Sequence, residues 1–363
     1  MPVPITAAVR SPFAEADGVL AGWHPVELAA VVMDAALEQA KLRADAVDLV
    51  IAGCAEPVGA QGANAAHACV LAAGWPASVP GVVVDAETIS GFAALAAALD
   101  AIAAGRAATV AVIGLNSASM VQPGAGALGR VYGRPWGDTV EARYADRGGL
   151  VPSITAADRA AVARGIDRAA QDGWGMRSLE RRSAPAAALV TVGARPSDSV
   201  AVQRETPIAT DVHRSIPIDE LEPVFDPDGT TTAAGLAPAA DGVAVMVLDA
   251  DATTRLGELV SLGIGAGDPI DPIAGIDVAR EIDAARWSVA EPSASTALLA
   301  IDALGLDPSL VNPDGGTIAV GDAAAAEDLR LLIDALHAAD PGAEGAVLRN
   351  GGGAAAVSVW RRS

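Results

Sequence analysis

The sequence predicts an α/β fold with two similar halves and an inserted middle region. Strand-like and helix-like segments alternate at both ends of the chain, which is typical of a mostly parallel sheet covered by helices. Residues 116–240 interrupt this alternation with an Arg-containing segment that ends in a Pro- and Asp-rich stretch. The chain has 363 residues and is 52% hydrophobic, so it can bury a large core in more than one domain.

Short apolar runs and helical patterns follow one another in the first half. The helix expected at 25–40 has Pro25 in its first turn, where proline is favoured. The segment 90–105 is rich in Ala and carries one charge, Asp100, so we expect a helix that is enclosed on every side. Strands are expected at 4–9, 47–53, 81–84 and 109–114.

The last third repeats this scheme, which indicates an internal fold repeat. Its segment 293–304 is nearly free of charge and is expected to be the enclosed helix of this half. The other helices are expected near 276–284 and at 323–338. Strands are expected at 258–264, 286–290, 318–321, 345–348 and 354–360.

The charge of the chain is strongly negative and unevenly distributed. A net charge of −21 argues against nucleic acid and anionic membranes as partners, because both would be repelled. Residues 116–240 hold 13 Arg against 15 Asp and Glu, so the rest of the chain carries −19. The middle region is therefore the part of the chain that would repel an anionic ligand least.

Two features favour a cytoplasmic location. Cys54 and Cys69 are the only cysteines, which is too few for a disulfide framework and indicates a reducing compartment. The N-terminus lacks the pattern of a signal peptide, and no long uncharged apolar run predicts a membrane span. No metal site is predicted.

Several short motifs, in order along the chain, resemble those of the thiolase family. Residues 311–322 read Val-Asn-Pro-Asp-Gly-Gly-Thr-Ile-Ala-Val-Gly-Asp and match a family signature in all but the last position. Weaker matches lie at 8–13, 24–28, 62–64, 154–156, 176–178, 228–233, 241–242 and 351–353. The resemblance therefore runs nearly end to end.

This resemblance implies a five-layered αβαβα fold built of two β-α-β-α-β-α-β-β halves. The first half would comprise residues 1–115 and 241–256, and the second half residues 257–363. Residues 116–240 would form the inserted loop domain, which binds coenzyme A in the family. Coenzyme A or an acyl-CoA is expected as a ligand rather than as a permanently bound cofactor.

Thr88 occupies the position of the family's nucleophilic cysteine at the N-terminus of the first enclosed helix. A helix N-terminus lowers the pKa of a thiol and favours the thiolate. A hydroxyl is a much weaker nucleophile unless a base activates it. Thr88 can instead act as a helix N-cap, which is an ordinary role for threonine.

The other reactive positions implied by the resemblance are also altered. Asp322 stands at the position of a histidine that helps to bind the thioester oxygen, where a carboxylate would repel a developing oxyanion. Arg349 stands at the position of the second cysteine and cannot act as a general base. Alternatively, Asp322 caps the following helix, and Arg349 pairs with Asp322 in a structural role.

Three more positions are singled out by the resemblance. Glu291 is the one residue left of an Asn-Glu-Ala-Phe motif, whose asparagine is replaced by Ala290. Ala237 and Gly352 fall in the region that contacts coenzyme A. Six further residues are expected to have ordinary packing or surface roles and no part in catalysis: His24, His67, His213, His337, Cys54 and Cys69.

These changes leave three functional hypotheses open. The first is a thiolase-like protein of acyl-CoA and lipid metabolism that has lost conventional activity and acts as an acyl-CoA binder or a structural partner subunit. The second is an enzyme of altered chemistry on an acyl-CoA, such as retro-aldol cleavage, hydration or acyl transfer, that uses Glu291, Asp322 and Arg349. The third is an acyl transferase that uses Thr88 or Ser90.

The resemblance also implies an assembly. We expect a homodimer that forms through the edge of the first-half sheet near residues 79–84. An active paralogue or an accessory subunit is a further expected partner.

Overall fold

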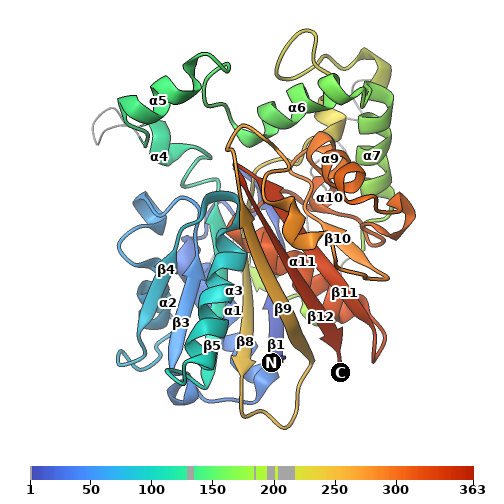
Figure 1. The fold of residues 1–363 in the computed structure, drawn as a ribbon. Helices are drawn as coiled ribbons and strands as arrows, with labels where there is room; N and C mark the ends of the chain where they lie inside the picture. Colours follow the sequence, from blue (N-terminus) through green and yellow to red (C-terminus); the bar gives the residue numbers. More distant parts are fainter. Residues whose placement is uncertain (1, 129–134, 184, 194–200, 203–216) are drawn as a thin grey trace.

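A ten-stranded sheet runs through both halves of the molecule, as a computed structural model shows (Figure 1). The structure describes residues 2–128, 135–183, 185–193, 201–202 and 217–363. The strand order is β10-β11-β12-β9-β1-β8-β5-β3-β4, and the short strand β2 pairs with β8. The halves are joined where Val3 to Ile5 of β1 pair with Gly257 to Leu259 of β9.

The first half combines parallel and antiparallel strands. Its strands are β1 (Val3–Arg10), β2 (Ala14–Glu15), β3 (Leu49–Gly53), β4 (Gly81–Val84), β5 (Thr109–Ser117) and β8 (Ala240–Asp249). Its helices are α1 (Pro25–Ala40), α2 (Ala65–Ala72) and α3 (Ser90–Ala103). Strand β3 is parallel to β4 and β5, whereas β8 is antiparallel to β1 and β5.

The second half has fewer regular elements. Its strands are β9 (Gly257–Ala266), β10 (Trp287–Val289), β11 (Glu344–Gly351) and β12 (Ala354–Arg362). Its helices are α9 (Ala294–Leu304), α10 (Thr317–Val320) and α11 (Ala325–Ala338). Strand β11 is parallel to β10 and antiparallel to β12, which is antiparallel to β9.

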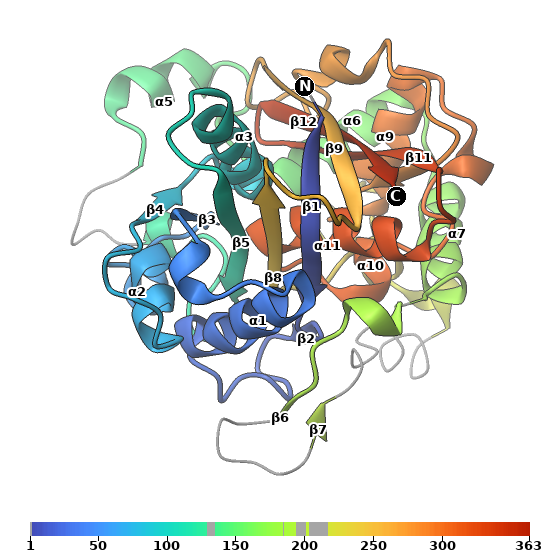
Figure 2. The same cartoon turned by 90° about the horizontal axis from the view of Figure 1, so that it is seen from below.

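Three hydrophobic clusters divide these elements into layers. Helices α1 and α2 pack on the outer face of the first half, as Figure 2 shows. Helices α3 and α11 pack against each other and against strands of both halves. Helix α9 and the 3-10 turn η7 (Ile276–Ala279) cover the outer face of the second half. The predicted five-layered α/β fold is confirmed.

The enclosed helix of the second half is α11, and the prediction that residues 293–304 would fill this place is wrong. Helix α11 is buried although it carries four charged residues in its first ten positions. Its charges pair internally: Arg330 bonds Glu327 and Asp334, and Asp334 also binds Arg10 of β1 at 2.8 Å. Pairing of this kind is what permits charged groups to be buried.

The nearly charge-free helix α9 lies on the outside of the second half. It is covered there by α6 (Ser153–Arg164) and α7 (Arg168–Glu180), both from the middle region. This helix, whose one charged residue is Asp302, is therefore largely buried although it is not the enclosed helix. Its cover comes from the middle region rather than from a second sheet.

Two smaller predictions in the second half are also wrong. Residues 318–321 do not form a strand, since residues 317–320 form the helical turn α10. The edge beside β10 is already occupied by Val311, which bridges to Trp287. The helix expected near 276–284 is only the short turn η7, which follows Gly275 in a left-handed conformation.

The middle region follows β5 and precedes β8. Its described elements include α4 (Ala125–Leu128) and α5 (Asp138–Ala145), which lie above the first half, and α6 and α7, which lie beside α9 (Figure 1). The short strands β6 (Val192–Gly193) and β7 (Ala201–Val202) pair with each other. Within the described part of the chain, no helix is long and apolar enough to span a membrane.

Candidate active site

Three distant segments meet at the N-terminus of α3. Thr88 lies in the 3-10 turn η3 (Glu87–Ile89), which leads into α3. Asp322 lies in the loop between α10 and α11, and Arg349 lies on β11. Arg349 Nε donates to the carbonyl oxygen of Thr88 at 2.9 Å, so the three positions singled out in the sequence are in one site.

The guanidinium of Arg349 is committed to carboxylates. Its Nη2 donates to Asp322 Oδ2 at 3.0 Å and its Nη1 donates to Asp322 Oδ1 at 3.2 Å. Its Nε also lies 3.4 Å from Asp328 Oδ1, and only 4% of the side chain is exposed. Burial opposes the charge, but Asp322 and Asp328 outweigh it and raise the pKa of Arg349. Arg349 is therefore a fixed internal cation.

Asp328, on α11, caps the helix that Thr88 precedes. Its Oδ2 accepts hydrogen bonds from the backbone N–H of Gly91 at 3.0 Å and of Phe92 at 3.3 Å. A Cβ at position 91 would lie 2.8 Å from the Cβ of Asp328, so glycine permits this close approach. Burial raises the pKa of Asp328 above its usual range, and the Arg349 cation acts in the opposite direction. No motif in the sequence points to this residue.

Thr88 itself does not cap α3, so the ordinary role considered for it is wrong. The helix begins at Ser90, whose Oγ accepts from the Ala86 N–H at 2.9 Å and donates to the Glu87 carbonyl at 2.7 Å. The Thr88 hydroxyl instead faces the glycine triplet. A Cβ at Gly352 would lie 3.1 Å from Thr88 Oγ1 and 3.0 Å from Glu87 Oε2.

Asp322 has two structural contacts. Besides its ion pair with Arg349, its Oδ1 accepts from the Ala324 N–H at 2.9 Å, just before α11 begins. Its backbone N–H donates to Pro238 at 2.8 Å, which connects the site to the segment that contains Ala237. The pair with Arg349 thus occurs, whereas the helix cap expected of Asp322 does not, because α11 has Ala324 at its N-cap and no side-chain cap bond.

Glu291 lies in a different environment. It is fully buried and accepts hydrogen bonds from Trp174 Nε1 and Ser178 Oγ on α7, and from Asn312 Nδ2 at 3.2 Å. Burial raises the pKa of Glu291, and these neutral donors lower it. None of these bonds reaches Asp322 or Arg349. The expectation that Glu291 would share their pocket is therefore not supported by its contacts.

Ala237 lies close to the same junction. Its N–H donates to the Pro292 carbonyl at 3.1 Å, so Ala237 contacts the residue that follows Glu291 in the sequence. Its methyl side chain provides no polar contact. Of the two residues expected to contact coenzyme A, only Gly352 directly borders Thr88.

Among the residues that the structure describes, no histidine or cysteine provides a base for this site. His24 accepts from Val26 N–H at the start of α1, and His337 bonds the Ala8 carbonyl at 2.8 Å. His67 lies on α2, and His213 falls outside the described residues. Burial raises the pKa of Cys54 to about 11 and that of Cys69 to about 12, so neither thiol ionises readily.

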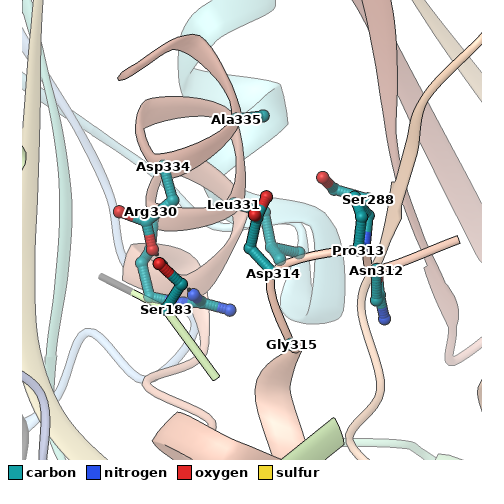
Figure 3. A pocket seen from close by; sticks show the side chains of 10 residues that line it. All are labelled: Ser183, Ser288, Asn312, Pro313, Asp314, Gly315, Arg330, Leu331, Asp334 and Ala335. Carbon is teal, nitrogen blue, oxygen red and sulfur yellow. Dashed lines mark hydrogen bonds and ion pairs between the residues drawn. The ribbon is translucent and has the colours of Figure 1, made fainter. Parts of the chain in front are cut away.

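A small polar cavity lies farther along α11. It has a volume of about 10 Å³, room for about one water molecule, and is too small for an acyl group. Figure 3 shows Arg330 and Asp334 of α11 on one side and Ser288 and Asn312 on the other. A groove of about 540 Å³ lies between the α6–α7 turn and the end of α9. Neither cavity is lined by Thr88, Asp322 or Arg349.

Comparison with known proteins identifies the class to which this fold and site belong. A family model described as the thiolase N-terminal domain matches residues 3–252. The chain belongs to the thiolase family, as its motifs predicted.

Individual relatives cover nearly the whole chain. The chain is 30% identical to a beta-ketoadipyl-CoA thiolase of Pseudomonas putida, over 92% of each sequence. It is 31% identical to an acetyl-CoA acetyltransferase of Cupriavidus necator, also over 92% of each. A crystal structure of the Acat5 thiolase of Ascaris suum in complex with coenzyme A superimposes with a TM-score of 0.84 at 25% identity and covers 100% of both chains.

Proposed function

We propose that this protein binds an acyl-CoA but does not carry out the cysteine-dependent thiolase reaction. It would act in acyl-CoA or lipid metabolism as a binder or as the structural partner of an active subunit. The observation that carries the proposal is the ion pair between Arg349 and Asp322 beside Thr88. These three residues replace the groups that thiolase chemistry needs at the matching positions.

The electrostatics of the site favour this reading. An anionic nucleophile or oxyanion is stabilised by N–H donors and by positive charge. Here the Gly91 and Phe92 N–H groups already bond Asp328, and Arg349 already faces two carboxylates. The groups that could stabilise a developing negative charge near Thr88 are therefore already bonded to carboxylates.

Coenzyme A binding is supported by similarity rather than by conserved chemistry. The similar structure from Ascaris suum is a complex with coenzyme A, and the chain follows that fold over its full length. Within the glycine triplet, Gly352 borders Thr88, is partly exposed and has no side chain, so its backbone is accessible. We infer that a CoA thioester enters on this side of the site.

The alternative of altered acid–base chemistry receives less support. It required Glu291, Asp322 and Arg349 to act on one substrate. Glu291 is bonded to α7 and Asn312 instead, and Arg349 holds Asp322 as an ion pair. A carboxylate in a tight ion pair is a poor general base, because the cation stabilises its ionised form.

The test separates binding from turnover. Purified protein is incubated with acetoacetyl-CoA and CoA, and thiolysis is followed next to the Cupriavidus necator acetyl-CoA acetyltransferase as the positive control. We expect a rate at least about 10³-fold below the control, because the activated thiol is missing. Thermal shift with CoA and acetyl-CoA in the same samples should show stabilisation.

Two results would contradict the proposal. Thiolysis at a rate close to that of the control would show that the site is catalytic. Failure of CoA and acetyl-CoA to stabilise the protein at millimolar concentration would show that the fold is kept without its ligand.

A further inference from the structure

Glu87 is the solvent-facing carboxylate at the mouth of the site. It is exposed, whereas Asp328 and Arg349 are buried and Thr88 is partly buried. Its Oε2 and the Thr88 hydroxyl both lie close to the position that a Cβ at Gly352 would occupy. A ligand that reaches Thr88 from solvent therefore passes Glu87.

The backbone holds Glu87 in this position. Its φ of +48° is in the left-handed region, which residues with a side chain rarely adopt. Its N–H donates to Asp85 Oδ1 at 3.0 Å, and its carbonyl accepts from Ser90 Oγ. An uncommon backbone conformation that persists is often found at functional sites.

Negative charge accumulates around Glu87. Burial raises the pKa of Glu87, and the nearby carboxylates of Asp85 and Glu56 raise it further. Glu56 is anchored by the Gly124 and Gly126 N–H groups at 2.6 and 2.8 Å. These three acidic side chains form the acidic rim of the site.

Two arginines that the structure describes near this part of the fold are already paired. Arg349 is bound to Asp322 and Asp328 behind Thr88. Arg147 pairs with Asp268 at 2.6 Å, next to the Pro269 that contacts Gly353. Within the residues that the structure describes, no hydrogen bond or ion pair neutralises the Glu87 side chain.

We propose that Glu87 selects against acyl groups that end in a carboxylate, so that the ligand of this site is a CoA thioester with an uncharged acyl chain. This inference rests on the proposed function, since it assumes that a CoA thioester binds with its acyl group beside Thr88. Like charges in a partly desolvated site repel each other strongly enough to alter affinity severalfold or more. Glu87 would then be a specificity-determining residue.

Two thioesters of equal length provide the test. Butyryl-CoA and succinyl-CoA both carry four acyl carbons, but succinyl-CoA ends in a carboxylate. Isothermal titration of the full-length protein should give a dissociation constant about tenfold higher for succinyl-CoA at low salt. The ratio should shrink in 0.5 M salt, where the Debye length is only a few ångströms.

Variants of Glu87 test whether this residue causes the difference in affinity between the two thioesters. Glu87→Gln should reduce the ratio to below about threefold by improving succinyl-CoA binding rather than weakening butyryl-CoA binding. Glu87→Asn is a second variant, because asparagine tolerates a positive φ. Glu38→Gln makes the same charge change on the exposed side of α1 and should leave the ratio unchanged.

Failure of the role proposed for Glu87 can be distinguished from failure of the proposed function. Equal affinity for both thioesters, or a ratio that Glu87→Gln and Glu87→Asn leave unchanged, would overturn the role of Glu87 alone. Binding of neither thioester would overturn the proposed function together with this inference.

Discussion

On the proposed function, Asp328 provides a physical reason why a cysteine at position 88 would not suffice for catalysis. The first N–H groups of α3 bond its carboxylate, so they are not available to a thiolate. The carboxylate also adds negative charge next to Thr88, which raises rather than lowers the pKa of a neighbouring thiol.

The contacts of Asp328 predict the behaviour of Thr88→Cys. The single variant should be alkylated by iodoacetamide at pH 7 no faster than an ordinary exposed cysteine. The double variant Thr88→Cys with Asp328→Asn should react at least about tenfold faster, because a neutral amide holds the Gly91 and Phe92 N–H groups less strongly than a carboxylate does. Intact-mass analysis measures both rates, and the parent protein controls for Cys54 and Cys69. Equal rates in the two variants would show that Asp328 does not control this site.

Arg349 should contribute strongly to stability. Arg349→Met leaves Asp322 and Asp328 without their cation, and we expect the free energy of unfolding to fall by about 3–5 kcal/mol. Urea denaturation measures this change. Arg43→Met is the matched control, since its pair with Asp45 is exposed, and its unfolding midpoint should hardly move. A similar midpoint for both variants would contradict a structural role for the buried pair.

The motif spacing located Thr88, Asp322 and Arg349, and the sequence could do so because each follows a recognisable local pattern. The pairing of Arg349 with Asp322 was also foreseen as one alternative. Asp328 could not be found in this way, because it bonds the N–H of a residue 237 positions away. A helix cap supplied by a distant element leaves no local signal in the sequence.

At the scale of elements, α11 contains a titratable group that links stability to pH. His337 donates to the Ala8 carbonyl at 2.8 Å, and burial lowers its pKa below the value of about 6.5 for a free histidine. The unfolded chain therefore binds a proton at a higher pH than the folded protein does. Stability from this group is complete above about pH 6.5 and is lost as the pH falls through the folded pKa.

The prediction is a pH-dependent melting temperature. Between about pH 7 and pH 5.5 the melting temperature of the parent protein should fall more than that of His337→Gln, which cannot be protonated. Differential scanning fluorimetry across this range measures the difference. His67→Gln on the partly exposed side of α2 is the control and should follow the parent curve. Parallel curves for parent and His337→Gln would contradict the assignment.

Elements with a clear local pattern were predicted well. Helix α1 and strand β4 occur at the predicted residues, because a proline at the first turn and a short β-branched run define them locally. The identity of the enclosed helix in the second half was not predictable from charge. Arg330 and Asp334 would place α11 at the surface unless their pairing within the helix and the bond of Asp334 to Arg10 of β1 were known.

At the scale of the whole molecule, β4 is the exposed edge of the ten-stranded sheet. It pairs only with β3 in the described chain, and Val82 is 48% exposed. An unprotected edge strand is a template for pairing with another chain. The homodimer expected from the sequence thus has a suitable surface, although the assembly stays a prediction.

A charged substitution on this edge should prevent association. Light scattering after size exclusion should give a dimer mass for the parent protein and a monomer mass for Val82→Lys, because an edge lysine opposes strand pairing. Circular dichroism should show that the fold is unchanged. Val31→Lys on α1 alters a valine of 37% exposure and should remain dimeric. A monomeric parent protein would rule out the expected interface.

The Asp328 cap also constrains how this lineage can evolve. On the proposed function, a route to cysteine-dependent chemistry would need a thiol at position 88 and release of the α3 N–H groups from Asp328. Removing Arg349 would leave Asp322 and Asp328 without their cation, at a cost of about 3–5 kcal/mol, which is comparable with the stability of many whole proteins. The contacts that join Asp328 and Arg349 would therefore oppose stepwise change at this site.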